Sequence, residues 1–167
     1  KTGAAGGVAP PPNPLRWHPC DLPVDAPDFV DGLRSMVVNG EPDAQTGMAA
    51  HVYLVGRSMT RRAFVNADGE MLIVPQQGAL TLTTELGVLR MAPGDVALVP
   101  RGLAFKVAVD GPSRGYVCEN YGAAFRLPEL GPIGSNGLAN PRDFEAPHAA
   151  YEADNAPHEI VRKFGGA

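Results

Sequence analysis

The chain has 167 residues, of which 44% are apolar, and a formal net charge of −4. That length suits a single domain of roughly 100–200 residues with a real core. The acidic balance and the lack of any basic run argue against nucleic acid or an anionic membrane as the main partner. No apolar run approaches the roughly 18 residues of a membrane span, and nothing resembles a signal peptide, so we expect a cytoplasmic protein.

Glycine and proline are abundant, at 20 and 17 residues. This composition favours a β-rich fold with many turns over a helical one. The two cysteines, Cys20 and Cys118, are far apart and lack metal-site spacing. The two cysteines are either reduced thiols or joined in one disulfide, and reduced thiols suit a cytoplasmic protein better.

The N-terminal residues 1–14 (KTGAAGGVAPPPNP) are rich in Gly and Pro and have no periodicity, which predicts an extended linker. Trp17 follows, and its large ring is expected to anchor this segment on the domain surface. Residues 28–38 (DFVDGLRSMVV) could contain a helical turn capped by Asp28. Residues 39–47 (NGEPDAQTG) indicate a polar loop.

From residue 49 onward, short runs rich in β-branched and aromatic residues are separated by turn residues. Such regular spacing predicts an all-β fold, and strands that avoid long open edges favour a cupin-like jelly-roll β-sandwich. We expect this sandwich to span residues 15–126. The predicted strands are 50–55, 61–66, 70–75, 79–84, 87–91, 95–99, 103–109 and 115–121, and a last strand-like run follows at 158–164.

Residues 127–167 begin with a long irregular stretch that is rich in Pro and Gly. Long loops of this kind inside a compact chain are usually functional or interfacial. We therefore expect a functional or interfacial segment. An ion pair between Arg142 and Asp143 could position this loop.

The segment from Gly94 to Phe105 has the spacing of the second cupin motif, whose last position is usually a metal-binding His. Here that position holds Phe105. A cupin metal needs imidazoles and a carboxylate that converge on one point. The first motif, aligned on Gly78, puts Met71 at its Glu position, and its two His positions fall on Val65 and Ala67 or on Phe64 and Asn66. We therefore predict a pocket filled by side chains, with no metal, cofactor or catalytic residue in this chain.

The remaining candidates for chemistry are weak. No two of the four histidines form a ligand pair, and His51, which alternates with Tyr53, is interpreted as a half-buried strand residue with a backbone partner. Ser58 and Cys118 lack a plausible neighbouring base. Cys118 is instead expected to be a small core residue.

Residues 130–144 (LGPIGSNGLANPRDF) closely resemble homogentisate dioxygenase, the ring-cleaving enzyme of phenylalanine and tyrosine breakdown. The resemblance extends from about residue 13 to residue 164, in order and with family-like spacing. It implies a two-part enzyme whose second part binds Fe(II) through two His and one Glu and uses O2 to open homogentisate to 4-maleylacetoacetate. It also implies a homo-oligomer, a trimer or hexamer. Further matching runs are Asn13–Trp17, Phe64–Gly69, Leu72–Gln76, Thr84–Gly87, Pro100–Gly102 and Arg114–Tyr116.

On this interpretation, the chain is the structural, oligomer-forming sandwich of such an enzyme and is inactive alone. Its ends look cut from something longer, and the resemblance implies that residues 127–167 form an interdomain segment leading to the missing catalytic part. The alternative is a free-standing, metal-free cupin-type module that binds a small ligand. A cupin-type sugar isomerase or epimerase would need a polar pocket with a His base. The inward positions Phe105, Val107 and Leu82 are apolar, which counts against it.

Overall fold

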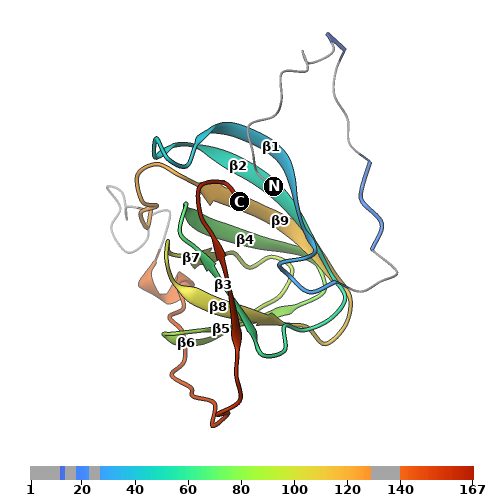
Figure 1. Ribbon diagram of the computed structural model, residues 1–167, viewed down its shortest axis with the longest axis vertical. Helices are drawn as coiled ribbons and strands as arrows, with labels where there is room; N and C mark the ends of the chain where they lie inside the picture. The colour runs from blue at the N-terminus through green and yellow to red at the C-terminus, as the bar shows by residue number, and fades with distance from the viewer. Residues whose placement is uncertain (1–11, 14–17, 23–26, 129–139) are drawn as a thin grey trace.

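Two five-stranded β-sheets pack face to face in the computed structural model (Figure 1). The residues that it describes are 12–13, 18–22, 27–128 and 140–167. Sheet 1 contains β1 (Leu33–Glu41), β2 (Thr46–Val55), β9 (Ser113–Asn120), β4 (Glu70–Gln77) and β7 (Ala97–Val99), in that order. Sheet 2 contains β10 (Glu159–Lys163), β3 (Arg62–Asn66), β8 (Ala104–Ala108), β5 (Leu80–Thr84) and β6 (Gly87–Met91), in that order.

The predicted all-β sandwich is confirmed, and each predicted strand from residue 50 onward corresponds to one of β2 to β10. Alternation explains why the sequence revealed them. In β5, Leu80 and Leu82 are buried while Thr81 and Thr83 face outward. In sheet 1, β9 lies between β2 and β4 and is antiparallel to both. These neighbouring strands are therefore joined by long connections. Only β10 differs among the described strands, because it pairs with β3 in parallel.

The prediction for residues 28–47 was wrong in its main part. Asp28 does cap a turn, since its Oδ1 accepts hydrogen bonds from the backbone N–H groups of Val30 at 3.0 Å and Asp31 at 3.1 Å. The turn ends at Gly32, where a Cβ would come within 2.0 Å of the Leu54 carbonyl oxygen. The chain then continues as β1 instead of a helix. Because β1 is an edge strand with a bulge, its alternation is weak in the sequence.

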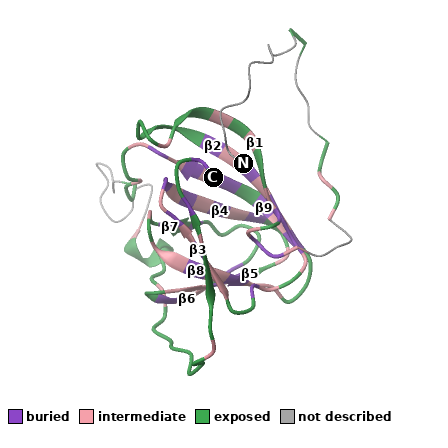
Figure 2. Ribbon diagram, in the orientation of Figure 1, coloured by how far each residue is buried: buried purple, intermediate pink, exposed green. Residues whose placement is uncertain are grey.

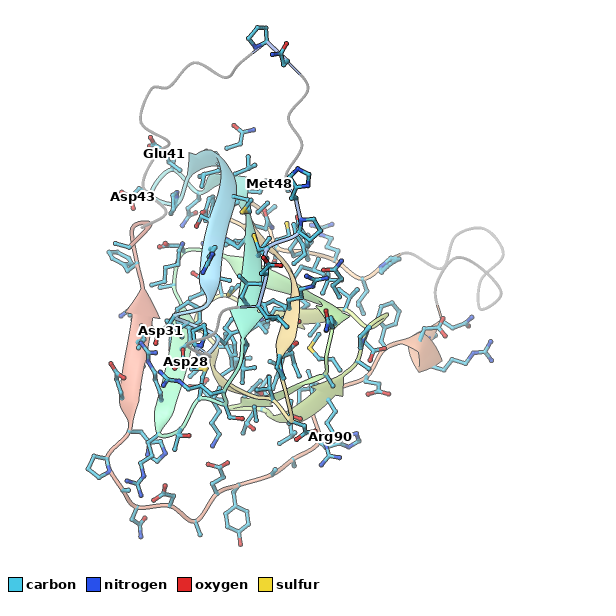
Figure 3. All side chains as sticks on the ribbon, turned by 90° about the vertical axis from the view of Figure 1, so that its right-hand side faces the viewer. Asp28, Asp31, Glu41, Asp43, Met48 and Arg90 are labelled. Atoms are coloured by element: carbon cyan, nitrogen blue, oxygen red, sulfur yellow. The ribbon has the colours of Figure 1, made fainter. Side chains whose placement is uncertain are left out.

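The turn before β1 is fixed to sheet 2 by Arg62 of β3. The Arg62 Nη1 donates to Asp28 at 2.8 Å and lies 3.0 Å from the Asp31 carboxylate. Figure 3 shows Asp28 and Asp31 beside each other at this point. The N-terminal turn is therefore joined to the sandwich by charge as well as by packing.

Between residues 140 and 158, the chain passes alongside sheet 2. His148 forms a β-bridge with Val88 of β6, and Lys106 of β8 is ion-paired with Glu152. The predicted pair between Arg142 and Asp143 is not found among the described residues. The Asp143 carboxylate instead accepts a hydrogen bond from the Asn140 N–H at 2.9 Å. Trp17 and residues 129–139, which include most of the loop that carries the family resemblance, lie outside the described residues.

The interior between the sheets is mostly apolar, and Figure 2 shows buried residues on the strands of both sheets. Phe29, Tyr53, Phe64 and Phe105 contact one another there as aromatic pairs. In the part of the chain that the structure describes, no helix is long and apolar enough to cross a membrane.

Candidate functional site

The cupin ligand positions lie inside this apolar core. The Phe105 ring packs edge-on against Phe64, with ring centroids 5.7 Å apart, and against Phe29 at 5.9 Å. Phe105 and Met71 are each 1% exposed. A phenyl ring and a thioether in a closed core do not fit Fe(II), which needs imidazole and carboxylate ligands. Among the described residues, no group of three or more His, Cys, Asp or Glu could hold a metal ion.

A cluster of buried polar side chains lies elsewhere between the sheets, and Glu119 of β9 is its centre. Its Oε1 accepts hydrogen bonds from Lys163 Nζ at 2.7 Å and Asn66 Nδ2 at 2.7 Å. Its Oε2 accepts from His51 Nε2 at 3.0 Å and the Tyr121 hydroxyl at 3.1 Å. Four donors therefore satisfy a carboxylate that is only 1% exposed, as a buried charge requires.

Asp68, in the turn between β3 and β4, extends this cluster to the end of the chain. Its carboxylate accepts a hydrogen bond from Lys163 Nζ at 2.8 Å and from the N–H groups of Gly165 at 2.7 Å and Gly166 at 2.8 Å. Gly165 and Gly166 have φ angles of 63° and 81°, which glycine adopts without strain. Lys163 thus bridges two carboxylates and fixes β10 to the sandwich.

His51 of β2 is fully enclosed, so the prediction of a half-buried histidine with a backbone partner was wrong. Its partners are side chains: Nε2 contacts Glu119, and Nδ1 lies 2.9 Å from the Ser35 hydroxyl. An ionised carboxylate can only accept, so Nε2 carries a proton and donates a hydrogen bond to Glu119. In the neutral imidazole, Nδ1 then accepts from Ser35.

The donors around Glu119 control its ionisation. Burial alone would raise the pKa of Glu119, but hydrogen bonds from His51, Lys163 and Asn66, together with the Lys163 charge, lower it from 4.5 to about 2. Burial, followed by the Glu119 charge and hydrogen bond and the Asp68 charge, raises the pKa of Tyr121. Tyr121 therefore remains a neutral donor, and Glu119 stays ionised at neutral pH.

The low pKa of Glu119 predicts an acid-sensitive fold. A depressed folded pKa gives stability that is complete above the unfolded value of 4.5 and is lost as the pH falls toward about 2. The contribution is about 3 kcal/mol. Urea unfolding between pH 6 and pH 2 should show this loss, and a Glu119→Gln variant should lack that part of the pH dependence. An equal slope in both proteins would contradict the assignment.

One end of the cluster opens to a surface cavity of about 170 Å³. Its walls include Leu33, Phe64 and Val161, and its polar groups include Ser35 and Lys163. The cavity therefore combines apolar walls with a few polar atoms, as small-ligand sites do.

Sequence reasoning missed this cluster, although one signal was present. In the strand predicted at 115–121, Glu119 lies two residues after the inward Val117, so it shares that face and had to point into the core. The same alternation places Cys118 on the outer side of sheet 1, half-buried, so its assignment to the core was wrong. Both Cys20 and Cys118 are free thiols in the structure.

Comparison with known families agrees with the fold and with the resemblance found in the sequence. The family model described as homogentisate 1,2-dioxygenase N-terminal matches residues 2–167. The chain belongs to this family. The polar cluster and the closed cupin position are therefore features of an N-terminal homogentisate 1,2-dioxygenase region.

Solved structures with similar folds are cupins and related proteins. A putative mannose-6-phosphate isomerase from Ralstonia eutropha has 18% identity and a TM-score of 0.51, with 66% of this chain and 100% of that chain covered. A cupin superfamily protein from Desulfitobacterium hafniense has 14% identity and a TM-score of 0.44, with 53% and 74% covered. A cupin-2 domain protein from Shewanella frigidimarina has 14% identity and a TM-score of 0.40, with 44% and 70% covered. The predicted cupin-like jelly roll is confirmed, and these likenesses concern the fold alone.

Proposed function

We propose that this chain is the structural, oligomer-forming β-sandwich of an Fe(II)- and O2-dependent homogentisate 1,2-dioxygenase. In that enzyme, iron, O2 and homogentisate are bound by residues outside this chain, and the ring is opened to 4-maleylacetoacetate. The irregular segment within residues 127–167 leads toward the catalytic part. The enzyme forms a trimer or hexamer in the cytoplasm, where free thiols such as Cys20 and Cys118 persist.

The closed cupin position is the observation that carries this division of labour. Phe105 and Met71 are sealed in the core, and the buried carboxylates of Glu119 and Asp68 are already paired with Lys163. An iron dioxygenase needs open coordination positions for its substrate. The described residues offer no such coordination positions at the cupin motif. The family to which they belong is nevertheless named after the dioxygenase reaction, which supports a catalytic site in another part of the enzyme.

Oxygen uptake tests this proposal. The 167-residue chain, given Fe(II) and homogentisate, should consume no O2, and adding the rest of the parent enzyme should restore uptake. The control is the intact parent enzyme under the same conditions. Uptake by the 167-residue chain alone would contradict the proposal.

A second candidate, a metal-free module for a small ligand, rests on the cavity beside Ser35 and Lys163. A ligand retained by the purified chain in native mass spectrometry, and lost after Ser35→Trp substitution, would favour that function. Retention of no small molecule would favour the structural role.

A further inference from the structure

An apolar row crosses the outer side of sheet 1 through all five strands. Directly paired positions place Val37, Ala50, Cys118, Leu72 and Leu98 in one continuous row from β1 to β7. The next row contains Val52, Tyr116 and Val74, and Met48 extends the surface along β2. Polar residues border this surface, since Arg34 pairs with Val52, and Asn120 pairs with Met48 and Glu70. We call the nine apolar residues the outer face of sheet 1.

Several of these side chains are open to solvent. Val37 is 46% exposed, Met48 49%, Tyr116 44% and Leu98 39%. A contiguous apolar surface of this kind is uncommon on a monomer and marks an interaction surface.

Two strands of sheet 1, β2 and β4, also have the sequence pattern of strands that are covered on both faces. Residues 48–55 (MAAHVYLV) and 71–74 (MLIV) are nearly continuous apolar runs. Antiparallel strands with one wet face alternate instead, as β5 (LTLTT) does in sheet 2. The outer positions of sheet 2 include Thr81, Thr83 and Lys106, which suit water. The two sheets therefore differ in what their outer faces are built to contact.

The described part of the chain covers little of this face. At one end, Arg114 donates a hydrogen bond to the Cys20 carbonyl at 3.2 Å, so residues near Cys20 lie against the sheet there. The segment from 140 to 158 follows sheet 2 instead, through His148 and Glu152.

The geometry points to an occupant. We propose that the outer face of sheet 1 is the docking surface for the iron-binding part of the same polypeptide, an inference that rests on the proposed function. The five strands, about 4.8 Å apart, make a face roughly 20 Å wide. A single helix is only about 10–12 Å across, so a folded domain with a flat apolar surface matches this width better.

The position of the last residues supports the same occupant. Ala167 and Gly166 line the cavity with Leu33 and Ser35 of β1, the edge strand of sheet 1. A Cβ on Gly165 would lie 3.8 Å from the carboxylate of Asp43, in the β1–β2 turn. Figure 3 shows Asp43 beside the end of the C-terminal strand, and Met48 on the neighbouring β2. Residues that follow Ala167 in the parent enzyme therefore start at the rim of sheet 1.

Alkylation of Cys118 in the intact parent enzyme tests the docking. Cys118 lies in the middle of the row, and peptide mass spectrometry separates its label from labels on other cysteines. The variant Leu98→Glu puts a charge on the face without touching Cys118. The matched control is Leu86→Glu, at an exposed turn of sheet 2 where Leu86 is 62% exposed.

We expect slow alkylation of Cys118 in the wild-type enzyme and in the Leu86→Glu variant. In the Leu98→Glu variant, alkylation should be about tenfold faster, because weaker docking lets the interface open locally more often. Met48→Glu, on the other side of the face, should act like Leu98→Glu, and circular dichroism should show that both variants keep the fold. Equal rates in all four proteins would overturn docking. If the protection of Cys118 disappears on dilution as the oligomer dissociates, the surface is covered by a second copy of the chain, and the proposed docking of the iron-binding part is wrong.

Homogentisate turnover by the wild-type enzyme keeps the two proposals separate. Turnover together with equal alkylation rates rejects the docking surface and leaves the proposed function standing. An intact parent protein that binds no iron and has no turnover rejects the proposed function, whatever the reactivity of Cys118.

Discussion

A Lys163→Met variant is expected to lower the free energy of unfolding by about 3–5 kcal/mol. Lys163 lies 2.8 Å from Asp68 and 2.7 Å from Glu119, and its side chain is 10% exposed. Without the ammonium group, two carboxylates remain in the interior with no cation between them. The strand β10 and the Gly165–Gly166 turn are held at this point, so they should become the first part of the domain to open. Urea unfolding at pH 7 gives the magnitude, and hydrogen exchange shows where the opening begins.

The matched control for that experiment is Lys106→Met. Lys106 is ion-paired with Glu152, but these two side chains are 24% and 55% exposed. Exposed pairs contribute about 0–1 kcal/mol. A Lys163→Met variant no less stable than the Lys106→Met variant would show that the buried cluster does not hold β10. Combining Lys163→Met with Glu119→Gln should recover part of the loss, because one of the two uncompensated charges is then absent.

A Phe105→Ala variant is expected to cost about 3–5 kcal/mol in stability. Phe105 fills the cupin ligand position and contacts the rings of Phe29 and Phe64. Its removal leaves a cavity that the stiff surrounding strands can close only in part. Thermal or urea unfolding would measure the loss.

The Phe164→Ala variant provides the comparison, because Phe164 is 67% exposed. Among the described residues, the contact found for its ring is the Arg162 guanidinium, 5.6 Å from the ring centroid. Its stability should change by about 0.5 kcal/mol or less. Similar small effects for both variants would mean that the ring at position 105 is not a core residue, and the ligand position would be open to a different interpretation.

The fold could be predicted from local pattern wherever one face of a strand is buried. In β5 and β8, apolar and polar residues alternate, so both the strands and their inward residues were recognisable. In β1 the pattern fails, because an edge strand with a bulge buries few of its side chains. Its strand conformation depends on pairing with β2, which no local signal specifies.

The buried cluster could be predicted only in part. The cupin spacing around Gly94 and Phe105 correctly located a closed position, because turn residues and an apolar ring are local features. The pairing of Glu119 with His51 and Lys163 joins residues 68 and 44 positions apart. Such contacts follow from strand order, and strand order is set by the packing of the whole sandwich. An inward-facing Glu119 could have indicated that a cation was needed, without identifying Lys163.

The cupin-like fold of this chain places apolar and polar residues in two separate parts of its interior. At the ligand position, Phe105 and Met71 complete an apolar core. The polar residues are concentrated instead around Glu119 and Lys163, where they fasten the last strand. Both features suit a domain that supports a catalytic partner.

The iron content of the purified 167-residue chain tests this account most directly. The chain would be incubated with excess Fe(II) without oxygen, freed of unbound metal, and analysed for iron per chain. No stoichiometric iron is expected, because the cupin ligand positions are apolar and the carboxylates of Glu119 and Asp68 are paired with Lys163. A one-to-one complex of Fe(II) with the chain would contradict the account.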